Sequence, residues 1–142
     1  MGTTNKVAIV TASDSGIGKQ CALVLAQQGF DIGITWHSDE EGAKAVAETV
    51  ASFGRRAETV QLDLSNLPEG AQAIQTLIDK FGRIDVLVNN AGAMSKAPFL
   101  EMEFKDWRTV FTVDVDGAFL CAQIAARKMV EQGEGCLLYT SD

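Results

Sequence analysis

The fold is decided by the stretch Val7-Ala-Ile-Val-Thr-Ala-Ser-Asp-Ser-Gly-Ile-Gly18, which joins an apolar run to a helix start through small residues. Four consecutive apolar residues, Val7–Val10, predict a strand covered on both faces. In the loop that follows, the free amides and dipole of the helix start favour an anion. Gly16 and Gly18 let the backbone approach an anion and the helix pack closely on the sheet. The stretch therefore predicts a strand–loop–helix unit with an anion site, and a helix start without a ligand is the alternative reading.

Apolar runs and helical periodicities alternate along the rest of the chain. Glycines end the expected helices at Gly29, Gly54 and Gly82, and Pro68 marks the first turn of one of them. Strands separated by helices require parallel crossovers, so we predict an α/β fold in one domain, residues 1–142. The expected strands are 7–10, 30–36, 57–62, 84–88 and a fifth from 136 to 140, and the expected helices are 16–28, a helix from the capping box Ser38-x-x-Glu41 to about Phe53, 68–82 and about 103–132.

Composition narrows the class of protein. The chain has 142 residues, is 46% hydrophobic and carries a formal net charge of −7, which argues against a nucleic-acid partner. It contains no leader-like segment, and no apolar run near the roughly 20 residues that span a bilayer, so we expect no membrane insertion and a cytoplasmic location. His37 is the only histidine, which leaves no metal cluster. The cysteines form no Cys-x-x-Cys pair and are expected to be reduced core thiols: Cys21, Cys121 and Cys136.

A second motif, Asn89-Asn90-Ala91-Gly92, directly follows the fourth expected strand. By itself it could be an ordinary turn. Together with the first loop it resembles the short-chain dehydrogenase/reductase family, whose fingerprint Thr-Gly-x-x-x-Gly-Ile-Gly is matched except that Ala12 replaces the first glycine. We expect Ala12 to take a backbone angle that an L-residue tolerates. The resemblance covers about residues 6–134, is closest to uncharacterised bacterial oxidoreductases, and implies a Rossmann-type doubly wound parallel sheet of order 3-2-1-4-5 that is truncated at its C-terminal end.

The resemblance also implies a nicotinamide-cofactor site at the carboxyl ends of the strands. The counterpart of Asp63 accepts a hydrogen bond from the adenine amino group, although Asp63 could instead cap a turn. The side-chain amide of Asn90 can hold two backbone groups that no strand pairing satisfies. The cofactor-binding residues carried over are Thr11, Ser13, Asp14, Ser15, Gly16, Ile17, Gly18, His37, Ser38, Asp63, Leu64, Asn90, Ala91, Gly92 and Val113.

The end of the second expected strand, Thr35-Trp36-His37-Ser38, bears on which cofactor binds. No carboxylate stands at Trp36 to hold the ribose hydroxyls of NAD(H). Relatives with an Arg-Ser pair at the positions of His37 and Ser38 use NADP(H), so we favour NADP(H), with these two residues contacting the extra phosphate. The alternative is that Ser38 only caps a helix and His37 is a solvated loop residue.

The family's catalytic residues are incompletely represented. Asp114 stands at the position of the family's catalytic asparagine, where it could instead only kink or hydrate the helix, and Ser141 lies near the position expected for the catalytic serine. There is no Tyr-x-x-x-Lys, since Tyr139 is the only tyrosine. We therefore expect the front part of an enzyme of typically about 250 residues, inactive as it stands. The complete form would transfer hydride between the cofactor and a small carbonyl or alcohol substrate. It would form a homo-oligomer through the face from Val110 to Ile124. The alternative is a catalytically silent nucleotide-binding or assembly module.

Overall fold

The computed structural model describes residues 5–139, and these form a five-stranded parallel sheet of order β3-β2-β1-β4-β5. This order confirms the topology that the resemblance implies. The strands are β1 (Val7–Val10), β2 (Asp31–Trp36), β3 (Ala57–Gln61), β4 (Val86–Asn89) and β5 (Cys136–Tyr139).

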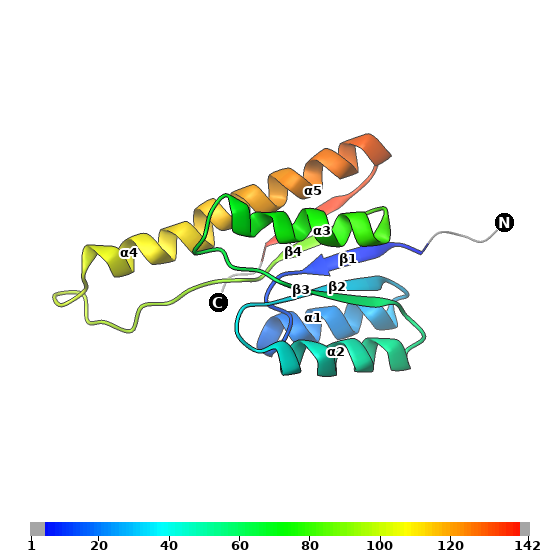
Figure 1. The fold of residues 1–142 in the computed structure, drawn as a ribbon, viewed down its shortest axis with the longest axis horizontal. Helices are drawn as coiled ribbons and strands as arrows, with labels where there is room; N and C mark the ends of the chain where they lie inside the picture. The colour runs from blue at the N-terminus through cyan, green and yellow to red at the C-terminus, as the bar shows by residue number, and fades with distance from the viewer. Residues whose placement is uncertain (1–4, 140–142) are drawn as a thin grey trace.

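Helices cover both faces of the sheet (Figure 1). They are α1 (Gly16–Gln27), α2 (Glu40–Ser52), α3 (Gln72–Phe81), α4 (Phe104–Phe111) and α5 (Ala118–Gln132). In Figure 1, α1 and α2 lie below the sheet, α3 and α5 lie above it, and α4 projects beyond the carboxyl ends of the strands. The carboxyl ends of β1 to β4 therefore lie between α4 and the start of α1.

Two hydrophobic cores follow from the alternation of side chains along β1. Val7 and Ile9 belong to the core under α3 and α5, whereas Ala8 and Val10 belong to the core over α1 and α2. Because successive side chains of a strand point to opposite faces, an apolar run such as Val7–Val10 fits a strand covered on both sides. The fully apolar pattern of this strand is thus explained by its central place in the sheet.

Several element ends differ from those expected, because specific hydrogen bonds or turns shift them. β2 begins at Asp31, because the Phe30 amide still donates to the Leu25 carbonyl at the end of α1. β4 begins at Val86, because the Gln132 side chain bonds both the amide and the carbonyl of Ile84. Pro68 precedes a 3₁₀ turn, Glu69–Ala71, from which α3 continues.

The cap of α2 also differs from the sequence expectation. Asp39, not Ser38, is the N-cap, and its side chain accepts a hydrogen bond from the Gly42 amide at 2.9 Å. A capping box of Ser38 and Glu41 was therefore wrong by one residue. Asp suits this position as well as Ser does, so the sequence offered two equally good caps.

The long helix expected from about 103 to 132 is interrupted by a π-helical turn, Thr112–Gly117. A Cβ at Gly117 would lie 2.9 Å from the Leu64 side chain, so only glycine allows this turn to approach the loop after β3. The helical stretch Phe104–Gln132 also contains an 18-residue window with a mean hydropathy of 1.3 and is long and apolar enough to cross a membrane, contrary to our expectation of no such run. Of that window 22% is buried, and the buried residues of α5 are Cys121, Ile124, Ala125 and Met129.

The cysteines are free but are not all core thiols as expected. Cys121 is buried, Cys21 is half-buried and Cys136 is exposed. Burial raises the pKa of the Cys121 thiol to about 12, which keeps it protonated and unreactive.

Candidate functional site

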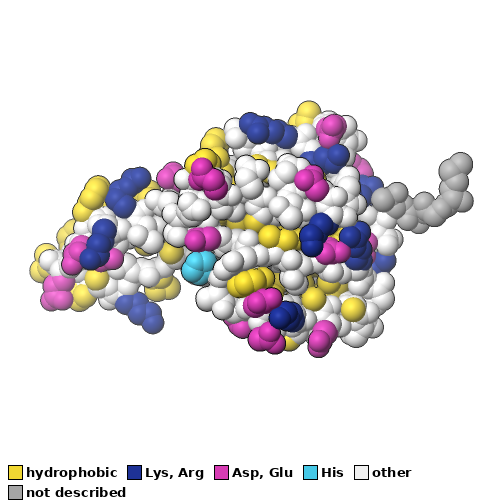
Figure 2. Space-filling model, viewed as in Figure 1, with side chains coloured by type: hydrophobic (Ala, Val, Ile, Leu, Met, Phe, Trp, Pro, Cys, Tyr) yellow, Lys and Arg dark blue, Asp and Glu magenta, His cyan; other side chains and the backbone are white. Residues whose placement is uncertain are grey.

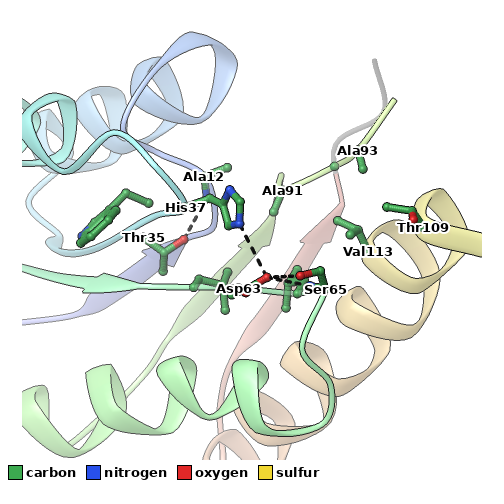
Figure 3. A pocket seen from close by; sticks show the side chains of 13 residues that line it. Ala12, Thr35, His37, Asp63, Ser65, Ala91, Ala93, Thr109 and Val113 are labelled. Carbon is green, nitrogen blue, oxygen red and sulfur yellow. Dashed lines mark hydrogen bonds and ion pairs between the residues drawn. The ribbon is translucent and has the colours of Figure 1, made fainter. Parts of the chain in front are cut away.

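A cavity of about 260 Å³ opens at the carboxyl ends of β1 to β4 (Figure 3). Such an edge, where the strand order reverses on the two sides of β1, is where open α/β sheets bind ligands. Most of the lining is apolar or small, and His37 and Asp63 are its ionisable side chains. The lining residues are Ala12, Thr35, Trp36, His37, Leu62, Asp63, Leu64, Ser65, Ala91, Gly92, Ala93, Thr109 and Val113.

The floor of the site is fixed by hydrogen bonds between Thr11 and Asn90, which we call the Thr11–Asn90 brace. The buried Thr11 hydroxyl accepts from the amides of Asn90, at 2.9 Å, and Ala91, at 2.8 Å. In return, the Asn90 side-chain amide donates to the carbonyls of Thr11, at 3.0 Å, and Ala12, at 3.2 Å. These contacts join the loops after β1 and β4 and confirm that the Asn90 side chain holds two backbone groups.

The loop after β1 turns tightly away from this brace. Ala12 has a φ of 51°, in the left-handed region that favours glycine, so our expectation of an easily tolerated angle was wrong. The Ala12 amide donates to the Thr35 hydroxyl at 2.9 Å, and the Ser13 hydroxyl donates to the Val10 carbonyl at 2.8 Å. The surrounding contacts therefore hold a strained residue where the family has glycine.

Gly18 permits close packing of α1 on the brace. A Cβ at this position would overlap the Ala12 carbonyl oxygen and lie 2.5 Å from the Asn90 side-chain nitrogen. The N-cap residue of α1, Ser15, makes no side-chain capping hydrogen bond. The first amides of α1, including those of the exposed Gly16 and Ile17, are thus without an intrahelical or capping acceptor and suit an anion.

Asp63 and His37 face each other across one side of the cavity (Figure 3). The two atoms His37 Nε2 and Asp63 Oδ1 lie 3.6 Å apart. Asp63 Oδ1 also accepts from the Ser65 hydroxyl at 2.6 Å and from the Ser65 amide at 2.9 Å, and these hydrogen bonds hold the pKa of Asp63 below its usual value. The Asp63 carboxylate is therefore ionised and fixed in direction at neutral pH, as an acceptor must be.

Two further carboxylates carry charge in this region: Asp14, which interacts with His37, and Asp39, which interacts with Asp14. Burial raises the pKa of Asp14, and the charge of Asp39 raises it further, whereas His37 opposes this rise. Asp14 belongs to the loop before α1, and Asp39 caps α2. We refer to Asp14, His37, Asp39 and Asp63 together as the acidic rim.

Asp114, which stands at the position of the family asparagine, lies in the π-helical turn. Its Oδ1 atom accepts a hydrogen bond from the Ala93 amide at 2.7 Å. The side chain thus anchors the segment that follows Gly92 rather than only kinking or hydrating the helix. A role in proton transfer is not tested by this contact and stays a prediction.

The structure brings together most of the residues predicted from the sequence. His37, Asp63, Leu64, Ala91, Gly92 and Val113 line the cavity, Thr11 and Asn90 lie beneath it, and residues 13–18 form the adjacent loop and helix start. Ser38 is exposed and is not part of the lining, and Ser141 lies outside the described residues. Cofactor binding by these residues stays a prediction.

Sequence reasoning missed several lining residues. Thr35, Trp36 and Leu62 could have been found, because they lie at the ends of predicted strands that meet at the binding edge. Ala93 and Thr109 gave no such signal, since only the path of the loop between β4 and α4 brings them to the cavity.

Comparison with known proteins agrees with this geometry. The family profile described as short chain dehydrogenase matches residues 6–141. The uncharacterized oxidoreductase YohF of Escherichia coli (strain K12) is 76% identical over 130 residues, which are 92% of this chain and 51% of that protein.

Solved structures show the same likeness. The acetoin dehydrogenase YohF from Salmonella typhimurium is 70% identical with a TM-score of 0.92, over 95% of this chain and 54% of that one. A short chain dehydrogenase from Burkholderia cenocepacia J2315, in complex with NADP, is 34% identical with a TM-score of 0.83, over 87% of this chain and 50% of that one. The chain thus spans about half the length of the relatives it matches, and over that length it belongs to the short chain dehydrogenase family.

Proposed function

We propose that this chain binds a nicotinamide dinucleotide, with the adenosine end in the cavity and the pyrophosphate at the start of α1. The observation that carries this proposal is the cavity beside the uncapped first turn of α1, with Gly18 allowing the helix to approach the brace. An apolar slot with a fixed carboxylate, Asp63, suits a base that carries an amino group. The NADP complex of the Burkholderia cenocepacia relative supports the same class of ligand.

We further propose that a longer form interconverts a carbonyl and an alcohol. The bound cofactor would supply the hydride, while the protein positions the reactants. The name of the Salmonella typhimurium relative suggests acetoin or a similar small hydroxyketone as the substrate class. The 142-residue chain contains no Tyr-x-x-x-Lys, so we expect it to bind the cofactor without turnover.

Further proposals concern the preferred cofactor, the location, the domain organisation and the assembly of the protein. We propose NADP(H) in preference to NAD(H), a cytoplasmic location, one folded domain, and a homo-oligomer in the longer form. The face from Val110 to Ile124 was the wrong choice for this contact, because its residues Val113, Leu120, Cys121 and Ile124 pack into the core. The proposed oligomer is supported instead by a separate row of exposed apolar residues along α4 and α5, because such surfaces usually mark interfaces. Phe104 is 75% exposed and Phe119 61%, and Trp107, Phe111 and Val115 lie between them at helical spacing.

Fluorescence can test cofactor binding directly, because Trp36 lines the cavity and Trp107 is the only other tryptophan. In a Trp107→Phe background, titration with NADPH or NADH should quench Trp36 fluorescence in a saturable way and raise the melting temperature. The nucleotide 5′-AMP should compete, whereas nicotinamide mononucleotide should not, because only the former carries the adenosine end. A folded chain that binds none of these nucleotides would contradict the proposal.

Turnover separates an enzyme from a silent binding module. We expect no NADPH oxidation by the 142-residue chain with a panel of small diketones. We expect oxidation by a longer chain that contains these residues and continues into a Tyr-x-x-x-Lys motif. A longer chain of this kind that binds NADPH but reduces no carbonyl compound would favour the silent module.

A further inference from the structure

The lining of the cavity has one feature that bears on the choice of cofactor. Within residues 5–139, no Lys or Arg lines this cavity, and His37 is its only side chain able to carry a positive charge. Figure 2 shows this histidine at the hollow surface with an acidic side chain beside it and no Lys or Arg adjoining it in that view. A phosphate group near the end of β2 therefore has no permanent cation to meet in the cavity.

His37 is positioned by its neighbours on β3. The Gln61 side chain donates to the His37 carbonyl at 2.9 Å and fixes the backbone after β2. The imidazole is 69% exposed, and its Nε2 atom lies 3.6 Å from Asp63 Oδ1. The ring is therefore open to solvent and to a ligand while its backbone is held in place.

Carboxylates from two loops interact with His37, and a third carboxylate interacts with one of them. Asp63 follows β3 and Asp14 belongs to the loop before α1; both interact with His37, and Asp39, the N-cap of α2, interacts with Asp14. Lys44 on α2 is engaged by Glu40 and Glu41 at 3.2 and 2.9 Å. The 2′-phosphate of NADP(H) would thus lie near these negative charges. Within the cavity lining, a protonated His37 imidazole is the group that would offset them.

We propose that protonation of His37 determines the preference of this site for NADP(H) over NAD(H), so that lowering the pH favours NADP(H). The inference rests on the proposed cofactor function and adds a pH-dependent selectivity to it. Histidine changes its charge in the neutral range, unlike the arginine or lysine that would give a permanent preference. With a neutral imidazole, the carboxylates of the acidic rim repel the 2′-phosphate, whereas the uncharged 2′-hydroxyl of NAD(H) is little affected.

The direction of the effect follows from the charges. Below neutral pH the imidazolium donates to the phosphate and pairs with its negative charge. A phosphate monoester takes up a proton only near about pH 6, so the phosphate keeps most of its charge while histidine is being protonated. Because His37 is exposed, we expect an effect of about fivefold, the upper end for a solvated ion pair.

The test uses 2′,5′-ADP and 5′-AMP, which differ only in the 2′-phosphate. We expect the ratio of the 5′-AMP to the 2′,5′-ADP dissociation constant to fall about fivefold between about pH 6.5 and about pH 8.5. In His37→Gln the ratio should be low and should vary only with ionisation of the phosphate itself. In His37→Arg it should stay high across the whole range, because the guanidinium remains charged.

The outcomes separate a failure of the pH-dependent selectivity from a failure of the proposed cofactor binding. A wild-type ratio that follows the His37→Gln curve, with 5′-AMP still bound, would overturn only the pH-dependent selectivity. Failure of both nucleotides to bind at every pH would overturn the proposed function and this inference with it. In Asp39→Asn, which keeps a good helix cap but removes one carboxylate, we expect the ratio of the 5′-AMP to the 2′,5′-ADP dissociation constant to rise about twofold at about pH 8.5.

Discussion

The Thr11–Asn90 brace and the acidic rim lie at the same edge of the sheet but are built in opposite ways. In the brace, a buried hydroxyl and a side-chain amide each satisfy two backbone groups at 2.8–3.2 Å. In the rim, His37 is mostly exposed and approaches Asp63 only to 3.6 Å. Loss of a buried polar partner is costly, whereas exposed charges contribute little to stability. The brace therefore fixes the shape of the site, and the rim is free to set its selectivity.

The largest loss of stability is expected from Thr11→Val, which keeps the shape but removes the hydroxyl. The amides of Asn90 and Ala91 would lose their acceptor, at a cost of about 4 kcal/mol in the free energy of unfolding. Urea denaturation measures this, with Thr11→Ser as the control that keeps the hydroxyl. Equal stability of the valine and serine variants would show that the brace contributes no more than the rim.

A smaller loss is expected from Gly18→Ala, because the new methyl group would force α1 away from Ala12 and Asn90. Overpacking of this kind costs about 3 kcal/mol and should also weaken NADPH binding. Thermal unfolding and NADPH titration would test both effects. Gly29→Ala is unsuitable as a control, since its φ of 96° adds strain of another kind. Gln20→Gly, at an exposed position of the same helix, reports ordinary helix weakening instead.

Asp85 is a buried carboxylate at the amino ends of the strands, opposite the brace and the acidic rim. Burial raises the pKa of Asp85, but hydrogen bonds from Arg83 and from the Val7 amide outweigh it, so that the pKa lies below its usual value. A lowered folded-state pKa contributes stability above the unfolded value of about 4, and this stability is lost as the pH falls through the folded value.

We therefore expect Asp85→Asn to lower the free energy of unfolding by about 2 kcal/mol at about pH 7. The gap between wild type and variant should narrow at about pH 3, because this pH lies below the unfolded pKa of about 4 and part of the stability contributed by the ionised carboxylate is lost there. Urea denaturation at both values measures the change. A gap that is independent of pH would show that Asp85 acts by shape and not by charge.

Ala12→Gly, at the loop beside the brace, is expected to raise the stability of the protein, unlike the substitutions above. Glycine relieves the left-handed strain at φ 51°, and the gain exceeds the added freedom of the unfolded chain, for a net stabilisation of about 0.5–1 kcal/mol. Differential scanning calorimetry of the two proteins measures it. A loss of stability would mean that the Ala12 methyl group makes a packing contribution larger than its strain.

The smallest effect on folding is expected in the rim. Because His37 is exposed, His37→Gln should change the free energy of unfolding by less than about 0.5 kcal/mol while altering nucleotide selectivity. Chemical denaturation of the variant, alongside the nucleotide titrations, separates the two readouts. A loss comparable to that of Thr11→Val would place His37 in the scaffold and end the contrast between the two regions.

Local patterns were sufficient to predict the strand and helix order. The apolar run Val7–Val10 requires a strand covered on both faces, and Gly82 ends α3 with a left-handed residue as expected. Ends of elements were less predictable, because side chains distant in sequence decide them. Gln132, for example, takes up the backbone groups of Ile84 and delays the start of β4.

By itself the sequence determined the fold class, the glycine-containing loop and the motif Asn89–Gly92, because strand, helix and turn preferences depend on near neighbours. Only the tertiary structure decided that Asn90 bonds to the loop after β1, that Asp114 anchors Ala93, and that carboxylates from two separate loops interact with His37. These contacts join residues that are far apart along the chain. Their geometry depends on how the sheet aligns its strand ends, which no local pattern specifies.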